Sequence, residues 1–481
     1  MAKAIAIIKI YVIIYISANK AKGMKKKMSD TIAAISTPQA AGGIGIVRIS
    51  GEKAAEIADR VFVPADKTSL TQSRGYAAHY GYVHNSDHKI DEAIALVFKA
   101  PKSYTGEDVV ELSCHGGLYV IKSVLRAVLA NGARMAEAGE FTRRAFENGK
   151  ISLTQAEAVM DIISAQGEQA ARAALSAREG RLAEKINAFK SKIVGYSAHL
   201  AAWADYPEED LIPVDTNELS ADLGRSIAEM RQMIADGDAG KVMRDGVDTV
   251  IVGKPNVGKS TLMNCLAGCE RSIVTHIAGT TRDIVEEKVI LGDVILRLAD
   301  TAGIHDTNDL VESIGVQRSI ERMKNAGLII AVFDNSMPLD ENDDKLLEAL
   351  KNRPCIAVIN KNDMENRLDV EAIRHAIAKV VYISAKDEKG IDLLGEAVSE
   401  LLGVADLNPA DGILSGERQL NCCRNCLKML EEAKTALDIG MTLDAVNVSL
   451  DSAIACLLEL TGERATEVVT DAVFHHFCVG K

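Results

Sequence analysis

Gly253-Lys254-Pro255-Asn256-Val257-Gly258-Lys259-Ser260 fits the pattern G-x-x-x-x-G-K-[ST] and decides the fold of the middle of this chain. It follows Thr249 to Val252, an apolar run typical of a buried strand. In such a loop, backbone N–H groups point at phosphate oxygens, the lysine offers a positive charge to the outer phosphates, and the serine hydroxyl can bind magnesium. The stretch therefore predicts a nucleotide site, against the alternative of a glycine-rich turn that matches by chance.

Three further segments, in the right order and spacing, extend this prediction to a GTP site. Asp300-Thr301-Ala302-Gly303 can supply an aspartate to the magnesium shell and a glycine N–H to the γ-phosphate. Asn360-Lys361-Asn362-Asp363 places a carboxylate where it can accept from the two N–H donors on the edge of guanine, which adenine cannot satisfy. Ser384-Ala385-Lys386 completes the base pocket. The nucleotide is therefore predicted to be GTP.

The segment around these motifs has the pattern of a P-loop GTPase domain, with a doubly wound, mostly parallel sheet. Apolar runs alternate with helical stretches between about Gly246 and Gly403, and each motif follows one of the runs. The expected strands after the phosphate loop are Val294 to Leu298, Leu328 to Phe333, Cys355 to Ile359 and Val380 to Ile383. The domain is placed at residues 244–403.

A switch segment is expected between the phosphate loop and Asp300. Gly279-Thr280-Thr281-Arg282-Asp283 lies there, and Thr281 is expected to bind magnesium together with Ser260. After Gly303 comes Ile304 and not the glutamine that many GTPases use to orient the attacking water, and no arginine finger is evident. The residues alone leave four candidates for orienting that water: His305, Asp306, Asp309 and Glu312.

The region before the phosphate loop predicts an α/β or α+β domain. Its expected strands are Thr31 to Ser36, Gly45 to Ile49, Ala93 to Phe98 and Val109 to Ser113, and its expected helices are Gly51 to Val61 and Gly117 to Ala130. Arg48 and Glu111 each stand inside an expected strand. A charge among apolar neighbours must face solvent, a partner or a pocket, so both are candidate binding residues.

Long helices are expected on both sides of the GTPase segment. Ala, Glu, Lys, Arg and Leu dominate from Ser152 to about Lys241 and again from about Gly416 to the end. The GTPase segment is therefore predicted to be inserted into one helical domain, residues 149–243 and 404–481. The acidic segment Asp205 to Asp210 is expected to connect helices, and Trp203 is expected in the core. The tail after His475 could be either a frayed end or a functional segment.

Composition excludes some classes of protein. The length of 481 residues suggests about two to four domains, and a net charge of −13 argues against a protein that coats nucleic acid non-specifically, while a local basic patch stays possible. Nine cysteines without a regular framework favour a reducing compartment. Cys422, Cys423 and Cys426 lie close together, but no second pair at metal-ligand spacing lies near them in the sequence. Helix thiols are therefore favoured over a zinc site.

Residues 1–27 need separate handling. Ala4 to Ser17 is an apolar run that contains Lys9, and it is shorter than the roughly 18 to 20 residues needed to span a bilayer. It could be a signal peptide or anchor, or an upstream extension from a misplaced start, with Met28 opening the native protein. The second interpretation is favoured, because an exported domain would have no GTP. A cytoplasmic protein without a membrane partner is therefore expected.

Several stretches together resemble the MnmE (TrmE) family of tRNA-modification GTPases. They are Gly42-Gly43-Ile44-Gly45-Ile46-Val47-Arg48-Ile49-Ser50-Gly51, Tyr104-Thr105-Gly106-Glu107-Asp108, His115-Gly116-Gly117, Gly139-Glu140-Phe141-Thr142, Asp205-Tyr206-Pro207-Glu208-Glu209 and the terminal Cys478-Val479-Gly480-Lys481. The resemblance covers the chain from about Met28 to Lys481, so residues 1–27 fall outside it.

The resemblance implies roles for residues that the motifs alone leave open. It implies an N-terminal tetrahydrofolate-binding domain that dimerises, residues 28–148, with folate contacts on Arg48, Glu111, Lys150 and Lys481. Cys478 becomes a candidate participant near the folate. The family's catalytic glutamate falls on Glu312. Its potassium ligand falls on Asn256, helped by backbone carbonyls of Thr275, Ile277 and Thr280, and potassium would supply the charge that an arginine finger brings elsewhere.

The resemblance also implies partners. It predicts a homodimer that works with MnmG, an FAD enzyme, in a heterotetramer or larger complex, and that adds an aminomethyl-type group at carbon 5 of the wobble uridine of certain tRNAs. Methylene-tetrahydrofolate would be the one-carbon donor, and GTP hydrolysis with Mg²⁺ and K⁺ would drive the dimer's conformational change. Two rival interpretations stay open: a ribosome-assembly GTPase, and a folate-binding scaffold whose GTPase domain only signals occupancy.

The motifs and the resemblance together give one set of predicted GTP-binding residues. These are Asn256, Val257, Gly258, Lys259, Ser260, Thr261, Thr275, His276, Ile277, Ala278, Gly279, Thr280, Thr281, Asp300, Thr301, Ala302, Gly303, Asn360, Lys361, Asp363, Ser384, Ala385 and Lys386.

Overall fold

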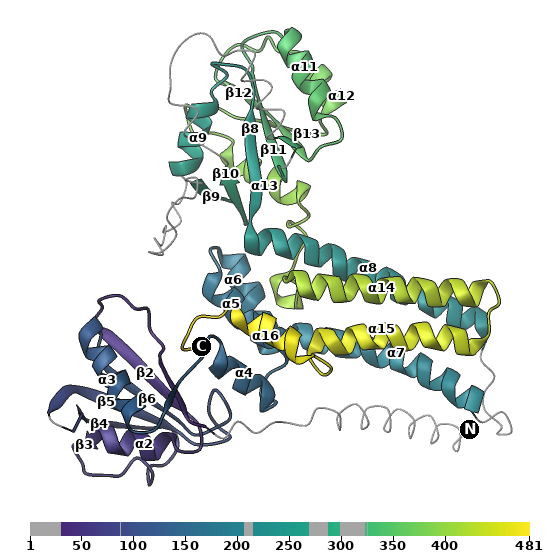
Figure 1. Cartoon of the computed structure of the whole chain (residues 1–481). Coiled ribbons are helices and arrows are strands. Elements are labelled where there is room, and N and C mark those ends of the chain that lie inside the picture. The colour runs from purple at the N-terminus through teal and green to yellow at the C-terminus, as the bar shows by residue number, and fades with distance from the viewer. Residues whose placement is uncertain (1–29, 87, 206–214, 269–286, 299–322, 325) are drawn as a thin grey trace. The chain divides into compact units, whose positions relative to one another are not determined.

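A computed structural model describes residues 30–86, 88–205, 215–268, 287–298, 323–324 and 326–481 (Figure 1). The chain divides into two compact units. One consists of the residues up to Met160 with Ala183–Leu223 and Lys428–Lys481, and the other of Asp161–Leu182 with Gly224–Leu427. The predicted extension at 1–27, residues 206–210 of the acidic segment and the predicted switch residues lie outside the described residues.

The first unit contains a seven-stranded sheet in the order β3-β4-β5-β6-β2-β1-β7. Its strands are β1 Ile32–Ile35, β2 Ile44–Ser50, β3 Phe62–Pro64, β4 Ala77–His84, β5 Lys89–Phe98, β6 Val109–His115 and β7 Arg134–Met135. All neighbours are antiparallel except β1 and β7. Helices α2 (Ala54–Val61) and α3 (Leu118–Ala130) pack on one face. Val47 and Ile49 of β2 join that core, so Arg48 between them belongs to the other face.

Helices make up the rest of this unit. They are α4 (Glu140–Glu147), nearly all of α7 (Arg181–Asp205), α15 (Leu443–Thr461) and α16 (Glu467–His475). Three more helices are divided between the units: α5 (Leu153–Ser164) belongs to the second unit from Asp161, α8 (Thr216–Asp245) from Gly224, and α14 (Glu417–Asp438) up to Leu427. Polar contacts join helices that are distant in sequence, such as Ser197 Oγ to Asp451 Oδ1 at 2.7 Å. None of the helices formed by the described residues is long and apolar enough to span a bilayer.

The second unit contains the predicted doubly wound sheet, in the order β13-β12-β11-β8-β10-β9. Its strands are β8 Val247–Val252, β9 Glu287–Leu291, β10 Val294–Leu298, β11 Leu328–Asp334, β12 Cys355–Asn360 and β13 Lys379–Tyr382, all parallel to their neighbours except β9. Its helices are α6 Glu168–Glu179, α9 Lys259–Gly268, α11 Glu341–Leu350, α12 Val370–Ala376 and α13 Ile391–Leu401, with a short 3-10 helix η1 at Pro409–Asp411.

Strand β11 shows why this sheet reads as a continuous apolar run in the sequence. Leu328, Ile330 and Val332 pack in the core that holds residues of α9 and α13, whereas Ile329, Ala331 and Phe333 pack in the core that holds residues of α11 and α12. A strand covered on both faces has no polar positions to alternate with. The predicted fold class is therefore confirmed.

Two predictions from the sequence are wrong or incomplete. Strands β3, β4, β7 and β9 were not predicted. Trp203 was expected in the core, but 43% of its surface is exposed, whereas its neighbour Ala202 is fully buried. Each step along a helix turns the side chain by about 100°, so Trp203 lies off the face that Ala202 buries. The predicted domain bounds stay predictions.

Candidate functional site

The phosphate loop connects β8 to α9 through backbone conformations that its sequence favours. Gly253 and Gly258 have φ of +147° and +100°, and Asn256 has φ of +64°, a region that asparagine enters more readily than most residues. A Cβ atom at Gly258 would clash with the Asn360 side chain, and one at Gly253 with the Val332 carbonyl. The two glycines therefore let the loop lie close against the ends of β11 and β12.

Lys259 opens α9, with its side chain folded back over the loop. Its Nζ donates hydrogen bonds to the carbonyls of Gly253 at 2.8 Å and Lys254 at 2.6 Å. Burial lowers the pKa of Lys259. Ser260 and Thr261 follow in the first turn of α9 and are exposed. The loop thus places an ammonium and two hydroxyl-bearing residues at the N-terminus of a helix, the arrangement that favours phosphate and magnesium.

Asn360 fastens the phosphate loop to the base-recognition segments. Its side chain is almost fully buried, donates to the Val257 carbonyl at 2.9 Å, and accepts from the Ala385 N–H at 3.0 Å. One amide therefore connects the phosphate loop, the end of β12 and the segment after β13. A buried amide with both ends bonded holds these three pieces in a single arrangement.

Ser384 orients the carboxylate of Asp363, the residue predicted to recognise the base. The Ser384 hydroxyl donates to Asp363 Oδ1 at 2.8 Å, and this bond, followed by a backbone N–H and the charges of Lys386 and Lys361, lowers the pKa of Asp363. Lys361, at φ of +62°, pairs with Asp334 Oδ2 at 2.5 Å. The Asp363 carboxylate is therefore ionised at neutral pH and is held by Ser384, from the segment after β13.

Lys254 ties the phosphate loop to helix α11. Its Nζ lies 2.8 Å from Asp340 Oδ2 and 2.6 Å from Asp343 Oδ2. Those two carboxylates also form the capping box at the start of α11. Burial works against the charge of Lys254, but the bonds from Asp340 and Asp343 outweigh it and raise its pKa. The G-x-x-x-x-G-K-[ST] pattern leaves the residue type at position 254 free, so this contact cannot be predicted from the motif.

Part of the predicted nucleotide site lies outside the described residues. Among the predicted GTP, magnesium, potassium and catalytic residues, this applies to Thr275, His276, Ile277, Ala278, Gly279, Thr280, Thr281, Asp300, Thr301, Ala302, Gly303 and Glu312. The described part brings together the phosphate loop, the Asn360–Asp363 segment and the Ser384–Lys386 segment. The roles of all these residues stay predictions.

A second charged cluster lies on the sheet of the first unit. Arg48 in β2 and Glu111 in β6 are directly opposite each other, and Arg48 Nε lies 2.8 Å from Glu111 Oε1. The Arg48 guanidinium is 5.4 Å from the centre of the Tyr104 ring and 5.6 Å from that of Phe141. The guanidinium of the predicted pair therefore lies near two aromatic rings, whose residues belong to the quoted motifs and have no predicted role.

The C-terminal tail docks onto this cluster. Val479 bridges to Ala138, and the Lys481 carbonyl accepts from the Phe141 N–H at 3.2 Å. The Gly480 carbonyl accepts from Ser36 Oγ at 3.1 Å and Arg48 Nη1 at 3.3 Å. Burial and the Arg48 charge lower the pKa of Lys481. The tail is therefore not frayed, and Arg48, Glu111 and Lys481 share one site.

The other two predicted residues of this region lie beside it. Lys150 donates from Nζ to the carbonyls of Pro101 at 2.9 Å and Ser103 at 2.6 Å, and so supports the loop that carries Tyr104. Cys478 is exposed, and its carbonyl accepts from the Gly139 N–H at 3.4 Å. Across the described residues no group of acidic, histidine or cysteine side chains could hold a metal ion, and the three clustered cysteines are buried helix thiols.

Two family models, which together cover most of the chain, match it, and both belong to the same protein family. The family model described as "GTP-binding protein TrmE N-terminus" matches residues 31–150, and the one described as "MnmE helical domain" matches residues 153–478. The tRNA modification GTPase MnmE of Geobacillus thermodenitrificans is 42% identical over 462 residues, covering 94% of this chain and 99% of that protein. The protein of the same name from Bacillus subtilis is 40% identical over 458 residues, covering 94% and 100%.

Solved structures add one further likeness. Aquifex aeolicus Era, solved with GDP and aluminium fluoride, is 30% identical and covers 38% of this chain and 66% of that one. Its TM-score is 0.25, which is too low to support an argument.

Proposed function

This chain belongs to the MnmE family of tRNA modification GTPases, and from that premise we propose how its two sites divide the work. It is a GTPase of tRNA modification. The GTPase activity is assigned to the second unit, and the observation that carries this assignment is the Asn360 side chain, which joins the phosphate loop to the base-recognition segments. The family match decides against a ribosome-assembly GTPase.

In the nucleotide site, the loop from Gly253 to Thr261 is proposed to hold the phosphates of GTP. Ser260 and Thr281 would bind Mg²⁺, while Asp363 would accept from the guanine edge. Glu312 is proposed to orient or activate the attacking water. These roles are supported by the helix N-terminus at Lys259 and by the carboxylate that Ser384 holds in place.

Potassium is proposed at Asn256, with the backbone carbonyls of Thr275, Ile277 and Thr280. The left-handed backbone at Asn256 exposes this side chain at the phosphate loop, which fits a role as a cation ligand. A monovalent cation there would supply charge to the developing phosphate in place of an arginine finger.

Replacing Asn256 with alanine is expected to remove the potassium dependence of GTP hydrolysis. Turnover by the unaltered chain should be about tenfold or more faster in K⁺ than in Na⁺, since one electrostatic contact to the transition state contributes about this much or more. Steady-state phosphate release in the two salts measures the ratio. Equal rates in K⁺ and Na⁺ for the unaltered chain, or an unchanged ratio for the variant, would contradict the role of Asn256.

The sheet cluster of the first unit is proposed to bind 5,10-methylene-tetrahydrofolate, which supplies a one-carbon unit. Glu111 can accept from the donors of the pterin, and Arg48, Lys150 and Lys481 can meet the acidic tail of the folate. The rings of Tyr104 and Phe141 offer stacking surfaces. Cys478 would stand near the one-carbon unit, and no nucleophilic role is assigned to it.

The complete reaction is proposed to need partners. A homodimer of this chain, working in the cytoplasm with an MnmG-type FAD enzyme, would add an aminomethyl or carboxymethylaminomethyl group at carbon 5 of the wobble uridine. GTP hydrolysis would drive opening and closing of the dimer. This division keeps the one-carbon chemistry in the first unit and the energy source in the second.

Mass spectrometry of wobble nucleosides in a strain lacking this protein tests the whole proposal. The C5-substituted uridine should disappear, and the unaltered gene should restore it. A Glu312→Ala gene should not restore it, although the variant should bind GTP as the unaltered chain does. Full restoration by Glu312→Ala would favour the scaffold interpretation, and a parallel loss of GTP binding would show that Glu312 is structural.

A further inference from the structure

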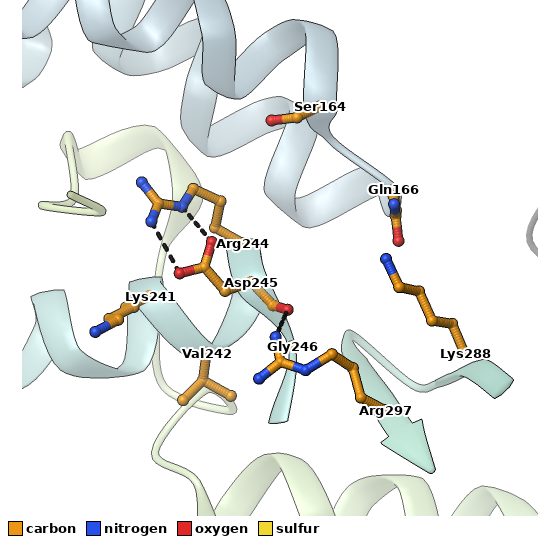
Figure 2. A pocket seen from close by; sticks show the side chains of 9 residues that line it. All are labelled: Ser164, Gln166, Lys241, Val242, Arg244, Asp245, Gly246, Lys288 and Arg297. Atoms are coloured by element: carbon orange, nitrogen blue, oxygen red, sulfur yellow. Dashed lines mark hydrogen bonds and ion pairs between the residues drawn. The ribbon is translucent and has the colours of Figure 1, made fainter. Parts of the chain in front are cut away.

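The second unit contains a cavity of about 420 Å³ at the edge of its sheet. It is bounded by the turn between α5 and α6, the C-terminal end of α8 and the hairpin of β9 and β10 (Figure 2). The lining residues are Ser164, Gln166, Lys241, Val242, Arg244, Asp245, Gly246, Lys288 and Arg297.

This cavity is not part of the nucleotide site. Gly246 lines it and directly precedes β8, whereas Gly253 follows β8 and opens the phosphate loop. Six strand residues separate the two glycines, which corresponds to about 20 Å along the sheet. A ligand in the cavity would therefore lie at the opposite end of the sheet from GTP.

The charges that line the cavity are mostly positive, in a chain whose net charge is −13. Four lining residues are cations: Lys241, Arg244, Lys288 and Arg297. The single lining carboxylate, Asp245, already accepts from Arg244 Nε at 2.7 Å and Arg244 Nη2 at 2.9 Å, as Figure 2 shows. The negative charge of Asp245 is therefore balanced by Arg244.

Carboxylates outside the lining hold three of the four cations in place. Arg297 Nε lies 2.7 Å from Asp248, Arg244 Nη1 lies 3.4 Å from Asp161, and Lys241 Nζ lies 2.6 Å from Glu417. None of these three carboxylates lines the cavity. They reduce the long-range field, but they also orient the cationic groups before a ligand arrives, which lowers the entropic cost of binding.

Lys288 differs from the other three cations. Its side chain is exposed, and within the described part of the chain no ion pair or hydrogen bond is found for it. Figure 2 shows its ammonium directed towards the side chain of Gln166, which lies in the turn after α5. Ser164 ends α5 nearby, and its hydroxyl donates to the Asp161 carbonyl at 3.4 Å. An oriented arginine, a lysine and a neutral amide are groups that proteins use to contact phosphate oxygens.

We propose that this cavity is a phosphate-binding site that takes a backbone phosphate of RNA. The proposal rests on the proposed function, because it presupposes an RNA substrate. An acidic chain repels a polyanion over most of its surface, so an approach needs a local group of cations. The cavity supplies three cations that carboxylates hold in place, together with exposed Lys288, for which no ion pair is found in the described part of the chain and whose charge therefore remains to attract a phosphate. A free phosphorylated molecule has the same chemistry, and the experiment separates the two.

The test uses fluorescence anisotropy of labelled tRNA bound to the full chain, with the nucleotide site filled by GDP and Mg²⁺. Lys288→Gln should weaken binding about five- to tenfold at 0.1 M salt, and should reduce the slope of log affinity against log salt by about 0.7 to 1, as for one lost phosphate contact. Lys288→Arg should keep most of the affinity. Lys345→Gln on α11, an equal change of charge at another exposed lysine, should change neither quantity.

The outcomes separate this proposal from the proposed function. The proposal is overturned if Lys288→Gln has the same affinity and salt slope as the unaltered chain. It is also overturned if the unaltered chain does not bind tRNA, or if Lys345→Gln loses as much affinity as Lys288→Gln. If Lys288→Gln weakens the binding of inorganic phosphate but not of tRNA, the ligand is a free phosphorylated molecule and not RNA. GTP hydrolysis should stay unchanged in Lys288→Gln, and only failure of the nucleoside test would count against the proposed function.

Discussion

Replacing Asp363 with asparagine is expected to shift nucleotide preference from GTP towards xanthosine triphosphate. A carboxylate accepts from both N–H donors on the guanine edge, whereas an amide places its own NH₂ against one of them. GTP affinity should fall by about 10²- to 10⁴-fold, because a site that loses a buried hydrogen-bond match discriminates strongly. Xanthine carries a carbonyl at the same place, which the new amide can satisfy. Ser384 still has an oxygen at position 363 to bond.

Competition binding with GTP, ATP and xanthosine triphosphate measures this shift. Asp344→Asn on α11 makes the same chemical change at an exposed carboxylate and should leave all three affinities unchanged. Equal losses for GTP and xanthosine triphosphate would mean that Asp363 only supports the fold. The lowered pKa of Asp363 also predicts the direction of the pH dependence. GTP binding needs the ionised carboxylate, so the affinity should be kept at neutral pH and lost as the pH falls through the pKa of Asp363.

Replacing Gly480 with alanine is expected to reduce tRNA modification strongly while leaving GTP hydrolysis intact. Gly480 has φ of +99°, and an added Cβ would clash with the Ile35 carbonyl and lie 3.0 Å from Ser36 Cα. Both obstacles are backbone atoms, so the tail must move. The Gly480 carbonyl would then lose its bonds from Ser36 and Arg48, and Lys481 would leave the cluster. Modified wobble uridine should fall about tenfold or more, since misplacement by about 1 Å can cost 10²-fold.

Gly440→Ala is the matched control for this change. Gly440 also has positive φ, +76°, but an added Cβ there meets no atom within 4 Å. The control therefore carries the backbone strain, about 1 kcal/mol, without the clash. Nucleoside mass spectrometry and binding of methylene-tetrahydrofolate should distinguish the two variants. Normal folate binding by Gly480→Ala, or an equal loss in Gly440→Ala, would contradict a role for the docked tail.

The nucleotide site could be predicted from the sequence because its information is local. The phosphate loop needs glycines at two fixed positions, and Asp363 is placed by the end of the strand that precedes it. Strands β11 and β12 are buried on both faces and are continuous apolar runs, and β8, β10 and β13 are also apolar enough to be predicted near their observed bounds. Strand β4 could not be predicted, because Ala77–His84 mixes histidine, tyrosine and glycine, so its alternating burial has no matching alternation of apolar and polar residue types.

By itself, then, the sequence determined a P-loop GTPase domain with guanine specificity between two helical segments, because these features depend on residue types at short, fixed spacings. Only the tertiary structure decided which distant residues meet. Arg48 faces Glu111 because their strands pair in one register, the tail reaches Arg48 across 432 positions of sequence, and four cations converge on one cavity from different elements. Such contacts depend on how elements pack, and neither residue type nor spacing along the chain encodes that packing in a readable form.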